Sequence, residues 1–215
     1  LGLEILSKEK IKELTNFNLP REKVYNLAKI FFKEQDRINE FVNYYYEGIK
    51  NGDWEVVSLF KARAEMLEML SKYNIKAVIA YNAAFDKKAL NCTMKEFSKY
   101  GTDHFFPEST IFWDSWGMAC ETILQHKSYY KNAHAKNWVS DAGNCMSNAE
   151  CAFRYTTKNL EFIEQHTALA DVLVEVEIFA KVMRQTKKMR REIFGNPWML
   201  IQPGFCKYVA SVAGC

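Results

Sequence analysis

Two stretches of the sequence carry acids and an imidazole of the kinds that metal-dependent reactions use. Asp86 follows an apolar run in "IKAVIAYNAAFD", and His166 and Asp171 stand five residues apart in "EQHTALAD". Carboxylate oxygens are the ligands that hard divalent cations prefer, and a neutral imidazole accepts a proton near pH 7. We therefore expect a cation site with a nearby base, provided that the two stretches meet in space.

Each of these residues also has a purely structural interpretation. An aspartate at the carboxyl end of a strand, where Asp86 is expected, caps the following helix as readily as it holds a metal. Phe85 beside it is either a core side chain or an exposed aromatic surface. On one helix, His166 and Asp171 would point about 140° apart. They converge only if His166 lies in a loop and Asp171 in the first turns of a helix, with Thr167 as its cap.

The elements that must position these residues are predicted as helices alternating with short strands, which is an α/β pattern. The run 75–80 is apolar apart from Lys76 and predicts a strand covered on both faces. A second strand is expected through residues 111–113, followed by a helix near Gly117 that Asp114 caps. Further helices are expected over residues 21–35, over 86–99 and after Ser58, whereas residues 125–150 are predicted to be polar and irregular.

The longest regular helix is expected to start near Ala168. Its apolar residues follow the 3.6-residue period and predict one buried stripe. This stripe consists of Leu169, Val172, Leu173, Val176, Phe179, Ala180 and Met183. The basic run 184–191 is interpreted as a solvated helix end, with contact to nucleic-acid phosphates as the alternative.

Composition limits the class of protein. The chain has 215 residues, 48% hydrophobic and 26% charged, which suits one main domain with an appendage. No apolar run approaches the ~18 residues of a membrane helix, so we expect no membrane partner. The net charge of +3 is too small to indicate a nucleic-acid binder by itself. Six cysteines form no CxxC pair, which predicts free thiols and a cytoplasmic location.

Taken together, the two acidic stretches resemble the second and third motifs, (H)NxxFD and HxAxxD, of the DnaQ-like DEDDh 3′–5′ exonucleases. The matching residues are Asn82, Phe85, Asp86, His166, Ala168 and Asp171. Tyr81 stands where many members have histidine. The resemblance covers roughly residues 40–190 and is strongest to exonucleases encoded by bacteriophages. It implies an RNase H-like fold, a mixed central sheet flanked by helices. We expect a helical segment 1–38, an exonuclease-like domain 39–195 and a tail 196–215.

The resemblance also implies a function, hydrolysis of phosphodiester bonds at the 3′ end of single-stranded DNA or RNA. Asp86 and Asp171 would hold two Mg²⁺ or Mn²⁺ ions, and His166 would accept the proton of the attacking water. Asn82 and Phe85 would contact the terminal nucleotide, Phe85 by stacking. A DNA polymerase or another replication protein is the implied partner, in the host cytoplasm if the protein is phage-encoded.

The family's first motif, Asp-x-Glu on a strand, is not found in its expected place. "LGLEIL" offers Glu4 but has Gly2 where the aspartate should stand, and Asp53 and Glu55 have the spacing but adjoin a turn. Two divalent cations carry four positive charges, which two carboxylates would bind poorly. We therefore expect either that an upstream segment supplies this motif or that the chain is an inactive relative. Such a relative would act as a nucleic-acid-binding or structural module.

Overall fold

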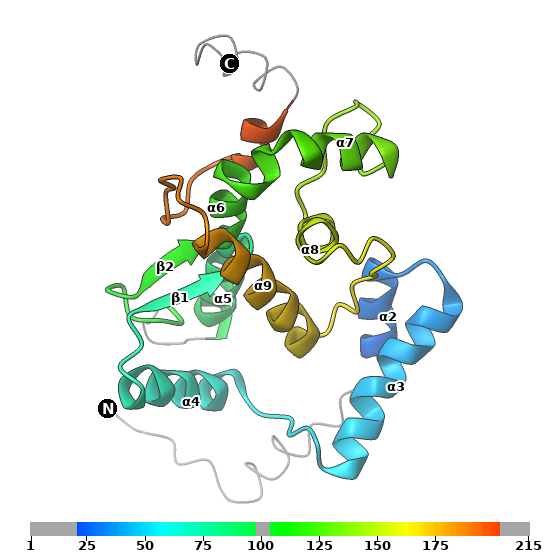
Figure 1. Cartoon of the computed structure of the whole chain (residues 1–215). Coiled ribbons are helices and arrows are strands. Elements are labelled where there is room, and N and C mark those ends of the chain that lie inside the picture. The colour runs from blue at the N-terminus through cyan, green and yellow to red at the C-terminus, as the bar shows by residue number, and fades with distance from the viewer. Residues whose placement is uncertain (1–20, 98–103, 203–215) are drawn as a thin grey trace, which may run out of the picture. The chain divides into compact units, whose positions relative to one another are not determined.

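The computed structural model describes residues 21–97 and 104–202 (Figure 1). Contacts along the backbone divide the chain into two compact units, Leu1–Met69 and Leu70–Cys215. The expected N-terminal helix before residue 20 and the tail beyond residue 202 lie outside the described residues. The elements, in chain order, are α2 (Arg21–Phe31), α3 (Gln35–Asn51), α4 (Leu59–Lys72), β1 (Ala77–Ala80), α5 (Ala83–Phe97), β2 (Ile111–Asp114), α6 (Ser115–Glu121), η1 (Ile123–Gln125), α7 (Lys127–Ala135), α8 (Ala149–Thr157), α9 (Ala168–Met183) and η2 (Pro197–Ile201).

The first unit has its own small core between α2 and α3. Apolar residues at helical spacing on each helix face the other, and the core is formed by Val24, Ala28, Phe32, Ile38, Phe41 and Val42. Gly52 ends α3 in the left-handed conformation, at φ +82°, which costs a glycine little. Ser58 precedes α4 and its hydroxyl accepts a hydrogen bond from the Lys61 amide at 3.2 Å, as expected of a cap.

In the second unit, β1 and β2 pair in parallel, with Ala80 opposite Asp114. The intervening helix α5 packs on both strands, so the three elements form a β-α-β unit. The prediction of an α/β chain is confirmed, with a two-stranded parallel sheet within the described residues. Both strands end at the same edge of this sheet, which brings the turns after Ala80 and Asp114 together (Figure 1).

The strand prediction over residues 75–80 is right in type but wrong in coverage. The strand begins at Ala77, and its residues are partly exposed, Ile79 most of all. The main core of this unit lies instead among the helices, where α6 and α8 pack on α9. Its largest fully buried side chains include Tyr129, Met118, Leu124 and Ile178.

Residues 125–150 are more regular than expected. Helix α7 covers Lys127–Ala135 and buries Tyr129 and Ala133, and the following loop buries Trp138 and Cys145. The expected loop at residues 141–144 is present and turns at Gly143, at φ +76°. The prediction of an irregular segment was wrong because a few large buried rings here stabilise structure between polar residues.

Helix α9 begins at Ala168 as predicted, but it buries a different face. The core side chains are Val174, Ile178 and Val182. Leu169, Val172, Leu173 and Val176 of the predicted stripe are exposed, Leu173 at 61%. The helix is apolar around most of its circumference, so a 3.6-residue period fits more than one face.

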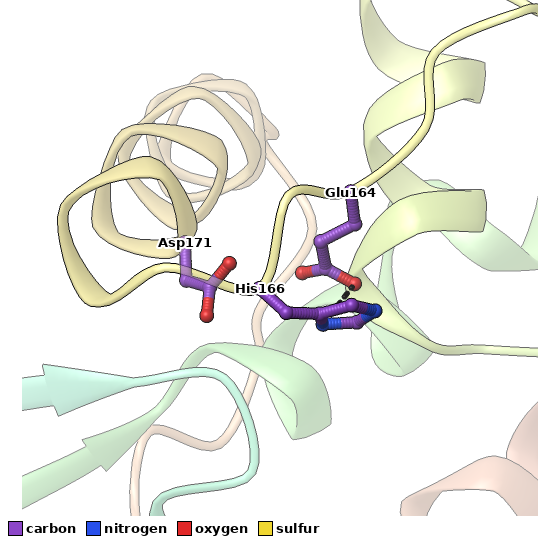
Figure 2. A group of neighbouring side chains, drawn as sticks. All are labelled: Glu164, His166 and Asp171. Carbon is purple, nitrogen blue, oxygen red and sulfur yellow. Dashed lines mark ion pairs between the residues drawn. The ribbon is translucent and has the colours of Figure 1, made fainter. Parts of the chain in front are cut away.

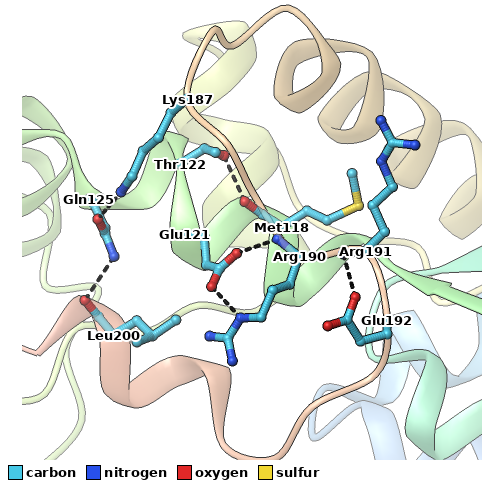
Figure 3. Close-up of polar contacts among 9 residues, drawn as sticks. All are labelled: Met118, Glu121, Thr122, Gln125, Lys187, Arg190, Arg191, Glu192 and Leu200. Carbon is cyan, nitrogen blue, oxygen red and sulfur yellow. Dashed lines mark hydrogen bonds and ion pairs between the residues drawn. The ribbon is translucent and has the colours of Figure 1, made fainter.

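The basic segment follows the end of α9, and its basic side chains are exposed, as expected of a solvated segment. Three of them also contact other elements of the second unit (Figure 3). The Arg190 Nε donates to Glu121 Oε1 at 2.6 Å, and the Lys187 Nζ donates to Gln125 Oε1 at 2.7 Å. The guanidinium of Arg191 lies 4.5 Å from the centre of the Trp113 ring. These contacts attach the segment to α6, η1 and β2.

Two predictions made from composition can be checked directly. In the ranges 21–97 and 104–202, no helix has both the length and the apolar character needed to cross a bilayer. The described cysteines, Cys92, Cys120, Cys145 and Cys151, are free thiols, as expected, and Cys206 and Cys215 lie outside the described residues.

Candidate metal centre

The site is built at the carboxyl edge of the sheet, where Asp114 fixes the geometry of two turns. Asp114 ends β2 and its Oδ1 accepts from the Asn82 amide at 3.1 Å and from the Trp116 amide at 3.2 Å. It therefore caps α6, as expected, and also holds the turn that follows β1. Asn82 has a left-handed backbone, at φ +70°, which asparagine adopts more readily than most residues.

Asp86 lies in the first turn of α5, four residues into the helix region that starts after Asn82. It is thus inside the helix rather than at its cap, so the alternative that Asp86 is the capping residue of this helix is wrong. Burial raises the pKa of the Asp86 carboxyl above its usual value, and the charge of Asp114 raises it further. An acid in this position gains from the positive end of the helix dipole and is available to a cation.

Glu164, His166 and Asp171 converge at the start of α9 (Figure 2). Each offers one ligand atom, and these atoms lie within 4.8 Å of one another. His166 lies in the loop and Asp171 in the first turn of the helix, the arrangement that their spacing required. Thr167 is at the cap position, but its side chain makes no capping hydrogen bond, contrary to expectation.

The loop that carries Glu164 and His166 is attached to α8. The Arg154 Nε donates to the Phe162 carbonyl at 2.6 Å, and the Glu164 amide donates to Glu150 Oε2 at 2.8 Å. Arg154 and Glu150 also form an ion pair with each other at 2.8 Å, and both are largely buried. One ion pair therefore positions the backbone on both sides of Ile163.

Glu175 connects α9 to the end of β1. This residue lies one turn after Asp171 on α9, and its Oε2 accepts from the Tyr81 amide at the end of β1, at 3.0 Å. Burial raises the pKa of Glu175 to about 7, and the charges of Asp86, Asp171 and Asp114 add to this increase. Among the described residues, the group of close ligand atoms consists of Glu164, His166 and Asp171 and does not include Asp86.

A similar environment surrounds Glu164. Its side chain is 14% exposed, and the Nδ1 of His166 lies 3.8 Å from its Oε2. Burial raises the pKa of Glu164 to about 7, with further contributions from the charges of Asp171, Glu150 and Glu175. Without a cation, these carboxylates repel one another in a partly dehydrated space.

The donor set fits a divalent cation. Asp171 Oδ1 is buried and finds no hydrogen-bond donor within the described part of the chain. A buried carboxylate oxygen without a donor is costly unless a cation or water satisfies it. Carboxylate oxygens such as those of Asp171 and Glu164 suit Mg²⁺ or Mn²⁺.

Of the two residues expected to contact substrate, Phe85 has the more informative position. Its side chain is 67% exposed, so the alternative of a core side chain is wrong. Phe85 is adjacent to Asp86 in the first turn of α5, and its amide donates to the Asn82 carbonyl at 2.8 Å. An exposed ring next to the acids is free to stack on a planar group.

Two acidic residues of the site were not singled out from the sequence. Glu164 stands two residues before His166, and Glu175 stands four residues after Asp171. The spacing of four places Glu175 and Asp171 on the same face of a helix. The sequence signal for this pair is that Asp171 and Glu175 interrupt the otherwise apolar run "ALADVLVEVEIF" at a spacing of four.

No protein-family model matches the chain, and neither a curated protein nor a solved structure does. The resemblance to the DEDDh exonucleases therefore stays a prediction carried by the motifs.

Proposed function

We propose that the chain is a 3′–5′ exonuclease that requires divalent metal ions and removes nucleotides from single-stranded DNA. The observation that carries the proposal is the convergence of Glu164, His166 and Asp171 within 4.8 Å, beside an Asp171 oxygen that has no donor among the described residues. The motifs that predict this activity supply His166 and Asp171 to this group and Asp86 to the first turn of α5.

Asp171 and Glu164 would hold a cation on the α9 side, and Asp86 would hold one on the α5 side. When bound, Mg²⁺ or Mn²⁺ ions lower the pKa of a water and stabilise the negative charge on the leaving 3′ oxygen. The turns that carry these acids are fixed by Asp114 and by Glu150, which reduces the reorganisation needed when substrate binds.

His166 is the proton acceptor in this proposal. Its Nδ1 lies on the side of Glu164, so a proton carried on Nδ1 leaves Nε2 available to take the proton of the attacking water. The Glu164 carboxylate then stabilises the imidazolium that forms, as an acid paired with a catalytic histidine does.

Substrate binding is assigned to the first turn of α5. The exposed ring of Phe85 would stack on the terminal base without selecting among bases, and Asn82 would contact the same nucleotide. This arrangement suits an unpaired 3′ end, because a base in a duplex does not offer its face.

The proposal is tested with a single-stranded DNA oligonucleotide labelled at its 5′ end, incubated with the chain and Mn²⁺ or Mg²⁺. We expect a ladder of products shortened from the 3′ end, which EDTA abolishes. Asp171→Asn and His166→Asn should lower the rate at least 100-fold, and asparagine tolerates the left-handed backbone of His166 at φ +55°. Glu177→Gln, an exposed position on α9, is the matched control.

Tight metal binding without shortening of the oligonucleotide would contradict the proposal and favour a module that binds nucleic acid without cutting it. Shortening of an RNA oligonucleotide alone would move the substrate to RNA. Equal rates for Asp171→Asn and the control would place the activity elsewhere.

A further inference from the structure

Lysines from three separate segments gather around His126, which lies between η1 and α7. Lys158 follows α8, Lys181 lies in the last turn of α9 and Lys187 lies beyond that helix, and all three are exposed. Partial burial of the ring lowers the pKa of His126, and the charges of the three lysines lower it further, so these charges act at one place. We call Lys158, Lys181 and Lys187 the lysine cluster.

Two members of the lysine cluster are held by uncharged groups. The Lys187 Nζ donates to Gln125 Oε1 at 2.7 Å (Figure 3). The Lys158 Nζ lies 4.3 Å from the centre of the Tyr155 ring. The hydroxyl of Tyr155 lies in turn 3.2 Å from the Nδ1 of His126. An uncharged partner fixes an ammonium group without cancelling its charge, so these cations are both ordered and available to an anion.

Acids are scarce in the segments that form this surface. Residues 155–160 and 181–191 contain none, and residues 115–135 contain only Glu121. Both oxygens of Glu121 already accept from Arg190, one from its amide and one from its Nε, each at 2.6 Å. Within the described part of the chain, no member of the lysine cluster forms an ion pair with a carboxylate. Its positive charge is therefore left for a ligand to neutralise.

The start of α7 makes the same surface more positive. Its first residue is Lys127, and its first turn contains no acid, although acids are favoured at that end of a helix. A small anion would pair with one or two of these cations. A polyanion with regularly spaced phosphates, such as a nucleic-acid backbone, pairs with all of them and releases its own counterions. The distribution of charge therefore fits an extended chain of phosphates.

The metal centre and the lysine cluster are joined by α9. Asp171 lies in the first turn of this helix and Lys181 in the last, ten residues apart, which is about 15 Å along a helix axis. Lys158 begins the loop that leads from α8 to His166. A strand whose 3′ end lies at the metal centre therefore needs a length of only a few nucleotides to bring its backbone to the lysine cluster.

We propose that the lysine cluster binds the phosphate backbone of single-stranded DNA, on the 5′ side of the nucleotide that is removed. The inference rests on the proposed function for its choice of polyanion, and it extends the bound substrate from the 3′ end to the strand behind it. Ammonium groups contact phosphates as point charges and read no sequence. The lysine cluster therefore raises the affinity for a long strand without selecting among bases.

The experiment measures binding of a fluorescein-labelled single-stranded DNA oligonucleotide by fluorescence anisotropy, in EDTA so that no strand is cut. The test variant replaces the whole lysine cluster: Lys158→Gln, Lys181→Gln and Lys187→Gln. The matched control makes the same change of net charge at three exposed lysines elsewhere: Lys33→Gln, Lys50→Gln and Lys95→Gln. We expect the Kd of the test variant to rise at least tenfold, and that of the control to stay within twofold of the unsubstituted chain.

Two further readouts separate contact with phosphates from a general loss of structure. Each phosphate contact contributes about 0.7 to the slope of log K against log salt for a single strand, so the test variant should lose about 2 from this slope. The p-nitrophenyl ester of thymidine 5′-phosphate is too short to reach the lysine cluster. Its hydrolysis by the test variant should therefore keep the kcat and KM of the control, whereas KM for the oligonucleotide rises.

The outcomes separate this inference from the proposed function. Equal Kd values and equal salt slopes for the test variant and the control would overturn the inference and leave the proposed function standing. If the test variant loses DNA binding but the unsubstituted chain shortens no oligonucleotide with Mn²⁺, the lysine cluster is a DNA-binding surface and the proposed function alone fails. Weaker binding of the test variant to phosphatidylserine vesicles, with unchanged binding to DNA, would assign the surface to an anionic membrane and overturn the inference.

Discussion

At the scale of single residues, the acids of the site make the metal-free protein sensitive to pH. Glu164 and Glu175 have a pKa of about 7 in the folded chain, against an ordinary value of 4.5. A carboxyl group whose pKa is raised by folding stabilises the fold fully below its unfolded pKa, and that stabilisation is lost as the pH rises through the folded pKa.

We therefore predict that, in EDTA, the free energy of unfolding falls between pH 4.5 and pH 7 by an amount on the order of 2 kcal/mol. The measurement is urea unfolding at half-unit steps of pH. A Glu164→Gln, Glu175→Gln double variant serves as the reference, because it carries all other titrating groups. Parallel profiles for the two proteins would show that these glutamates do not cause the dependence.

Phe85 allows a separate test of substrate binding. Because its ring is 67% exposed, Phe85→Ala should change the free energy of unfolding by less than about 0.5 kcal/mol. The loss of stacking should raise KM for a DNA oligonucleotide about tenfold, and Phe85→Tyr should restore it. A large loss of stability with an unchanged KM would instead mean that the ring has a packing role.

The residues of the site differ in how far the sequence predicts them. Asp86, His166 and Asp171 belong to spaced motifs, which predict that they converge. The structure brings His166 and Asp171 together, and the loop position of His166 follows from helix geometry. Glu164 and Glu175 are single acids outside those motifs. Their importance depends on which elements pack around them, and that is set by contacts between distant parts of the chain.

At the scale of elements, the loop before α9 depends on one ion pair. Arg154 and Glu150 hold the backbone at Phe162 and Glu164, and their side chains are 17% and 21% exposed. We predict that Arg154→Met lowers the free energy of unfolding by about 2 kcal/mol and weakens Mn²⁺ binding, because the loop loses its attachment.

Lys136→Met is the control for this prediction. Lys136 pairs with Glu161 at 3.8 Å, and both side chains are exposed, so the change should cost less than about 0.5 kcal/mol and leave metal affinity unchanged. Chemical unfolding measures the stability of both variants, and Mn²⁺ titration measures their metal affinity. Equal effects of the two substitutions would mean that the Arg154 pair has no special role in the loop.

Helix α9 shows what periodicity can and cannot predict. Its start was predicted correctly, since Thr167 and the apolar run mark it, but the buried face was wrong because both sides of the helix are apolar. Helix α7 was missed for the opposite reason. Its buried Tyr129 and Ala133 are separated by polar residues, so its pattern resembles a loop.

The assignment of faces on α9 gives a prediction of its own. Ile178 is fully buried, so Ile178→Ala should lower the free energy of unfolding by about 3 kcal/mol. Leu173, on the predicted stripe, is exposed, and Leu173→Ala should cost less than about 1 kcal/mol. Denaturant titrations of the two variants compare them directly. A larger loss of stability for Leu173→Ala would mean that the stripe predicted from the sequence is the buried one.

At the scale of the whole molecule, the metal-ligating candidates all lie in the second compact unit, whereas α2 and α3 have a separate core. Binding to one unit stabilises that unit by mass action. We predict that Mn²⁺ slows amide hydrogen exchange in residues 158–176 and around Tyr81, and leaves α2 and α3 unchanged. Hydrogen-exchange mass spectrometry with and without Mn²⁺ makes the comparison, and uniform protection of both units would contradict it.

The alternating periodicities predict the α/β class. They do not predict how small the sheet is or where the core lies. The described sheet is two short strands, and the main core of the second unit is formed by helices α6, α7, α8 and α9 with the segments between and after them. Sequence patterns identify elements from local spacing, whereas the size of a sheet and the position of a core depend on pairings between remote segments. The RNase H-like arrangement remains a prediction.

The carboxylate of Asp114 closes two neighbouring turns at once, one leading into α5 and the other into α6. Inserting or deleting a residue in either turn would break the hydrogen bonds that Asp114 makes to both turns, and would misplace Asp86 relative to the amide of Tyr81. Evolutionary change in loop length should therefore be concentrated at the opposite edge of the sheet, before Ala77 and before Ile111. At the carboxyl edge, where Asp114 holds both turns, we expect related sequences to differ by substitutions that keep the length of the turns.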